Sequence, residues 1–114
     1  MARSIRFVRR GVQGRVRQNF NWPAITARSV VHISAAEVSP GTTQLRQVPP
    51  TQDFHYHLGE ANIWISNVSP HQNEFSGQPG GVEFHVNVEW AAPIDVAITI
   101  TVEDEPPEEI QGYS

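Results

Sequence analysis

Alternation of apolar and polar residues at every second position is the feature that most constrains the fold of this chain. Residues 94–103 direct five β-branched side chains to one side, namely Ile94, Val96, Ile98, Ile100 and Val102. Residues 82–90 repeat the pattern with Val82, Phe84, Val86, Val88 and Trp90. A period of two is typical of a strand with one buried face. Because only Ala91-Ala92-Pro93 lies between the two runs, we predict an antiparallel hairpin over 82–103, with Trp90 in the core.

Weaker strand signals extend over most of the remaining chain. Alternating or β-rich runs occur at residues 3–9, 14–20, 28–38, 52–58 and 61–68. No stretch of 12 residues has the apolar spacing of an amphipathic helix. Hydrophobic residues make up 39% of the chain and charged residues 18%, which is sufficient for a packed core. The sequence therefore predicts an all-β fold, either an antiparallel β-sandwich or a jelly-roll.

Charge is divided unequally along the chain. Residues 1–46 contain all eight Arg and one acid, which gives a formal charge of +7. Residues 47–114 contain eleven acids and no Arg or Lys, which gives −11. Six of the arginines lie within residues 3–17. We therefore predict extended terminal arms on a central domain, with a basic N-terminal arm over 1–20, the β-sandwich over 21–103 and an acidic tail over 104–114.

Several functional classes are disfavoured by residues that the chain lacks. There is no Cys, which excludes thiolate chemistry and Cys-type zinc sites. The sequence contains neither a Gly-x-Ser-x-Gly motif nor a Gly-rich phosphate loop. No apolar run approaches the ~18 residues of a membrane span, and no signal-peptide pattern follows the first arginines. We expect a protein made in the cytoplasm, with no membrane partner, no cofactor and no enzymatic activity.

The histidines provide one alternative hypothesis, a metal site. His55 and His57 alternate on one predicted strand, and His85 lies on another. The segment His55-Tyr-His57-Leu-Gly-Glu60 resembles the first cupin motif with one residue missing before the acid. Pro79-Gly-Gly81 with His85-Val-Asn87 resembles a distorted second motif. The resemblance implies a small metal-binding cupin-like protein in which His55, His57 and His85 hold the ion.

The tryptophans provide another alternative, a carbohydrate-binding module. Trp22 precedes a turn, and the polar-face residues Asn87 and Glu89 could join it and the polar loop 69–81 in a sugar site. β-Sandwiches of this size often bind carbohydrate. Trp64 and Trp90 are expected in the core.

The leading hypothesis is a structural subunit that assembles through its charged ends. Arginine-rich arms on β-sandwich subunits resemble those of some capsid proteins, so a virion decoration, adaptor or tail component of a phage is the expected class. The partner is then a second copy or a larger protein assembly, and nucleic acid is a less favoured partner of the arginines. The predicted interface residues are Arg3, Arg6, Arg9, Arg10, Arg15, Arg17, Glu103, Asp104, Glu105, Glu108 and Glu109.

Overall fold

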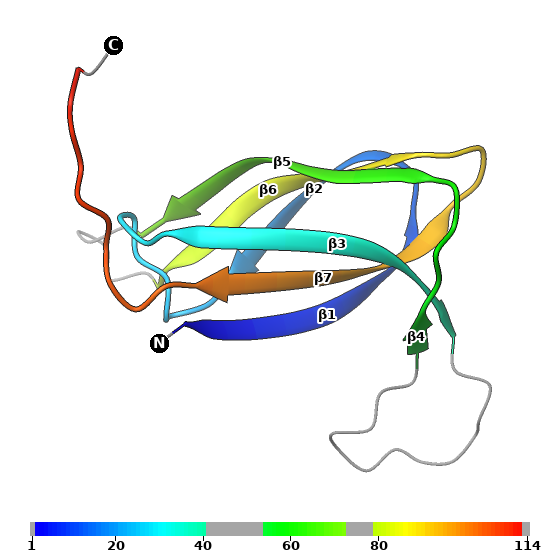
Figure 1. Ribbon diagram of the computed structural model, residues 1–114, viewed down its shortest axis with the longest axis horizontal. Helices are drawn as coiled ribbons and strands as arrows, with labels where there is room; N and C mark the ends of the chain where they lie inside the picture. Colours follow the sequence, from blue (N-terminus) through cyan, green and yellow to red (C-terminus); the bar gives the residue numbers. More distant parts are fainter. Residues whose placement is uncertain (1, 41–53, 73–78, 113–114) are drawn as a thin grey trace.

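In the part of the chain that the structure describes, seven strands form two antiparallel sheets that face each other. The computed structural model describes residues 2–40, 54–72 and 79–112. The strands are β1 (Arg3–Val12), β2 (Gly14–Asn21), β3 (Val31–Pro40), β4 (Phe54–Tyr56), β5 (Asn62–His71), β6 (Gly81–Glu89) and β7 (Ile94–Val102). One sheet has the order β1-β7-β3-β4 and the other β2-β6-β5 (Figure 1). The predicted all-β, sandwich-like architecture is confirmed, since the described residues contain no helix.

The core lies between the inner faces of β6 and β7. Val82, Phe84, Val86 and Val88 of β6 are buried, as are Val96, Ile98, Ile100 and Val102 of β7. These are the residues that the alternation assigns to one face of each strand. Each Å² of apolar surface that is removed from water stabilises a fold by roughly 25 cal/mol. The contact between these two faces is therefore the main stabilising contribution to the fold.

The predicted hairpin over 82–103 is wrong, although both of its strands exist. β6 pairs with β2 and β5, whereas β7 pairs with β1 and β3. The short link after β6 therefore crosses from one sheet to the other. In a hairpin the two apolar faces would lie beside each other on one sheet. In separate sheets they pack directly against each other.

The N-terminal segment is part of the sandwich, which corrects the prediction of an extended arm over 1–20. β1 pairs with β7, and β2 pairs with β6 along all eight of its residues. Phe7 of β1 and Phe20 of β2 stack across the two sheets, with ring centroids 5.2 Å apart. The strand signal in this segment is the outward Arg6 between the inward Ile5 and Phe7.

Two glycines lie where the chain passes from β1 in the four-stranded sheet to β2 in the three-stranded sheet. Gly11 and Gly14 have φ angles of 66° and 71°, in the left-handed region that other residues rarely adopt. Between them the buried Val12 ends β1 at an irregularity in its pairing with β7. The glycines that disfavour a helix in the sequence are therefore the residues that allow β1 and β2 to lie in different sheets.

The remaining segments connect or extend the sheets. β5 continues to His71 and β6 begins at Gly81, so the predicted loop 69–81 is shorter than expected, and its residues 73–78 lie outside the described residues. Residues 103–112 are exposed, contain neither helix nor strand, and run away from the end of β7 (Figure 1). The described residues include no helix that is long and apolar enough to cross a membrane.

Gly80 generates a stability prediction. Its carbonyl accepts a hydrogen bond from the Trp22 N–H at 2.8 Å, and a Cβ atom at this position would overlap with the carbonyl group of Ile25. A Cβ atom added at Gly14 would meet no other atom within 4 Å. Substitution there therefore costs only the energy of a left-handed backbone, about 1–2 kcal/mol. We expect Gly80→Ala to lower the free energy of unfolding more than Gly14→Ala does, measured by urea denaturation. A smaller effect at Gly80 would contradict the close approach of these two segments.

Candidate interaction surfaces

The three histidines of the metal hypothesis do not converge. His55 lies on β4 and His57 follows it, at the edge of the four-stranded sheet. His85 lies on β6, the middle strand of the other sheet. Within the described ranges no three His, Asp or Glu side chains are placed to share a metal ion. The structure therefore gives the cupin-like hypothesis no metal centre at these positions.

The tryptophans are also separated. Trp22 is half-buried against the core and bonds to Gly80, before β6 begins, whereas Trp90 follows the end of β6. A nine-residue strand spans about 30 Å, so Trp22 and Trp90 lie at opposite ends of the sandwich. Trp64 and Trp90 are 47% and 45% exposed. Their expected place in the core is wrong: Trp64 points outward between the inward Ile63 and Ile65, and Trp90 lies beyond the last buried position of β6.

Among the described residues, three arginines of β1 contact uncharged partners only. Arg3 lies over the Trp22 ring at 5.7 Å. Arg6 donates from Nε to Thr99 Oγ1 at 2.7 Å and lies over the Tyr56 ring. Arg9 donates to Gln18 Oε1 at 2.7 Å, which links β1 to β2 at the open side of the sandwich. None of the three forms an ion pair with a carboxylate of the described residues.

Other predicted interface arginines have carboxylate or amide partners in their own chain. Arg10 pairs with Asp95 at 3.5 Å, and Arg17 donates to Glu83 through both Nε and Nη2. The Nε of Arg15 donates to Asn87 Oδ1 at 3.3 Å. Of the six predicted interface arginines, Arg10 and Arg17 are thus neutralised by described carboxylates, whereas the other four are not.

The predicted acidic interface residues show the same division. Glu103 lies 3.4 Å from His32, and Glu109 accepts two hydrogen bonds from Arg28, at 2.9 and 2.7 Å. Glu105 and Glu108 are exposed and make no ion pair with a described residue. Exposed ion pairs stabilise a fold by at most about 1 kcal/mol, so the Arg28–Glu109 contact holds the tail only weakly.

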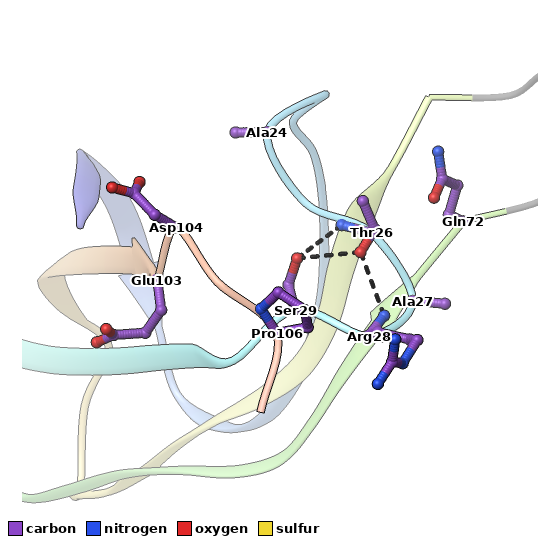
Figure 2. A pocket seen from close by; sticks show the side chains of 9 residues that line it. All are labelled: Ala24, Thr26, Ala27, Arg28, Ser29, Gln72, Glu103, Asp104 and Pro106. Atoms are coloured by element: carbon purple, nitrogen blue, oxygen red, sulfur yellow. Dashed lines mark hydrogen bonds between the residues drawn. The ribbon is translucent and has the colours of Figure 1, made fainter. Parts of the chain in front are cut away.

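A hollow of about 320 Å³ separates the start of this tail from the 24–29 turn. Figure 2 shows Glu103 and Asp104 on one side of it and Arg28 on the other. Ser29 accepts from the Thr26 N–H at 2.8 Å, which fixes the turn between them. Among the described residues, the lining of this hollow contains no histidine and no aromatic residue. Its polar groups are two carboxylates, one guanidinium, the hydroxyl groups of Thr26 and Ser29 and the Gln72 amide.

The outer face of the three-stranded sheet carries two rows of aligned side chains, most of them polar. The register aligns Arg15, Asn87 and Trp64 across β2, β6 and β5, and aligns Arg17, His85 and Ser66 in the next row. Asn87 is only 4% exposed, although it points outward. Its Nδ2 donates to the Trp64 carbonyl at 3.1 Å and to Ser66 Oγ at 2.9 Å, while Oδ1 accepts from Arg15. Asn87 therefore fixes both of its neighbours in the row.

Glu89 and His85 flank Asn87 on this face of β6. Glu89, at the end of β6, is exposed and accepts a hydrogen bond from Asn62 at 2.8 Å. His85 is half-buried, and its Nδ1 is a buried atom without a hydrogen-bond partner in the described part of the chain. Of the predicted sugar-site residues, Asn87 and Glu89 thus share this face, whereas Trp22 does not. The tryptophan on this face is Trp64 instead of Trp22. Its outward position could have been predicted from the sequence, because it alternates with Ile63 and Ile65.

Comparison with protein-family models, with curated proteins and with solved structures finds no match to this chain. The surfaces are therefore interpreted from their own chemistry.

Asn87 generates the second prediction. Asn87→Ala removes three hydrogen bonds around a buried amide, and we expect it to lower the free energy of unfolding by about 1–3 kcal/mol. The matched control is Asn62→Ala on β5, where one exposed hydrogen bond is lost and a change within about 0.5 kcal/mol is expected. Equal effects of the two substitutions in chemical denaturation would show that Asn87 does not organise the row.

Proposed function

We propose that the chain is a non-enzymatic structural subunit that associates with further copies of itself through unpaired charges. The observation that carries the proposal is a group of three β1 arginines that have no carboxylate partner among the described residues, Arg3, Arg6 and Arg9. The acidic counterpart is the exposed pair Glu105 and Glu108 on the C-terminal segment. Both groups belong to the same chain, so one copy supplies what the next copy lacks.

The expected contact is heterologous, because the two surfaces differ. Arg3 and the start of the tail are adjacent within one chain, since Arg3 pairs with Val102, yet no described carboxylate reaches that arginine. Contacts of this kind join copies head to tail, and they either close into a ring or continue as a filament or lattice. A small, Cys-free β-sandwich with these properties suits a virion component such as a decoration, adaptor or tail protein.

Nucleic acid is the less favoured partner. Counterion release by three to six arginines favours phosphate binding. Against it, the chain has a formal net charge of −4, and Arg10 and Arg17 are already paired with carboxylates.

Sedimentation velocity at low and high salt tests the proposal. We expect oligomers at low ionic strength and monomers near 1 M salt, where the screening length falls to about 3 Å. The triple variant Arg3→Gln, Arg6→Gln, Arg9→Gln should remain folded and sediment as a monomer at both salt concentrations.

The matched control removes the same charge from arginines that already have partners. It combines Arg10→Gln, Arg17→Gln and Arg28→Gln, and it should still associate at low salt. A monomeric native protein at low salt would overturn the proposal. Equal loss of association in both triple variants would also overturn it, because net charge and not its placement would then be responsible.

A further inference from the structure

The outer face of the three-stranded sheet holds a second, independent arrangement, which we call the Trp64 row. It consists of Trp64, Asn87 and Arg15, which the strand register places directly opposite one another on β5, β6 and β2. The outer members are two strand spacings apart, about 10 Å. The row uses none of the three β1 arginines of the proposed assembly contact.

One end of the row is an exposed indole on a rigid strand. Trp64 keeps 47% of its surface in contact with solvent, while its neighbours Ile63 and Ile65 pack against the core. A large aromatic ring fixed in this way offers a flat apolar surface with little conformational entropy to lose on binding. The apolar face of a sugar ring is a flat surface that matches it.

The other end of the row is a positioned guanidinium. Arg15 uses Nε to reach Asn87, and it forms no ion pair with a described carboxylate. Its two terminal nitrogens have no hydrogen-bond partner within the described ranges, and two parallel N–H groups match the two oxygens of a carboxylate. Asn87 is a positioning residue, since its buried amide is occupied by Arg15, Ser66 and the Trp64 backbone.

The surroundings distinguish between classes of anion. Glu89 lies on the same face of β6, and its carboxylate accepts hydrogen bonds, as it does from Asn62. It repels an anion that lacks donors and attracts hydroxyl groups. Glu83 is neutralised by Arg17. A ligand that carries hydroxyl groups, a carboxylate and a flat ring satisfies this set. An acidic peptide such as polyglutamate carries carboxylates but neither hydroxyl groups nor a ring that can lie on Trp64, and a DNA phosphate backbone carries no donor groups.

We propose that the Trp64 row binds an acidic saccharide, a chain of sugar rings that carries carboxylates. A ring lies on the Trp64 indole, the carboxylate of that ring or of the next accepts hydrogen bonds from Arg15, and hydroxyl groups donate to Glu89. This inference goes beyond the assembly function and does not depend on it.

Titration calorimetry with polygalacturonate tests the site, with dextran as a neutral saccharide and polyglutamate as an acidic peptide. We expect binding of polygalacturonate and at least about tenfold weaker binding of the other two polymers. Trp64→Ala and Arg15→Gln should each weaken polygalacturonate binding by about tenfold or more, equivalent to ~1.4 kcal/mol. Trp64→Tyr, which retains a ring, should keep most of the affinity.

Two controls remove similar groups elsewhere. Trp90→Ala deletes an equally exposed indole, and Arg28→Gln deletes a charge beside the tail. Both should bind polygalacturonate within about twofold of the native protein. So should the triple variant of Arg3, Arg6 and Arg9, which separates this site from the assembly contact.

The proposal is overturned by the absence of polygalacturonate binding, or by equal binding of polyglutamate with no effect of Trp64→Ala. Unchanged binding in Trp64→Ala or Arg15→Gln, with native-like thermal unfolding, overturns it as well.

Discussion

Packing of the inner face of β6 against the inner face of β7 is the interaction on which the other strands depend. Each of these strands is central in its sheet, so each needs a hydrogen-bonding neighbour on both sides. β3 and β5 supply one neighbour each, and β1 and β2 supply the other. The basic N-terminal segment is therefore required as two strands, because without it the backbones of β6 and β7 would each have an open side.

The arginines of β1 and β2 then lie where a sheet is most vulnerable to unwanted pairing. Edge strands present unpaired backbone groups, and charged side chains discourage another strand from adding there. A β2–β2 contact between two copies that aligned their Arg15 side chains would bring together two guanidinium groups that have no described carboxylate partner, an arrangement that like charges destabilise. The same positive charges do not repel a partner that carries carboxylates at its contact surface. This asymmetry favours a heterologous contact over a symmetric one, in agreement with the proposed assembly.

The alternation of single strands could be predicted from the sequence, but their assignment to sheets could not. The inward faces of β6 and β7 follow directly from their β-branched residues. Periodicity does not say whether a three-residue link joins neighbours in one sheet or strands in two, and the predicted hairpin failed there. The predicted convergence of the histidines is not seen among the described residues for the same reason, since His55 on β4 and His85 on β6 belong to different sheets. Trp64 could have been placed outward by its parity, because Ile63 and Ile65 are more strongly apolar neighbours.

The Trp64 row and the core share one strand register, which a β-bulge preserves. Between Ser66 and Ser69, β5 advances three residues while β6 advances two, so one residue is extra. Asn67 adopts a φ of 54° there, a conformation that Asn tolerates better than most residues. Without the extra residue, the alternation after the bulge would be reversed, and Pro70 would leave the inner face opposite Val82. The bulge therefore allows one strand to direct Trp64 outward before the bulge and Pro70 inward after it.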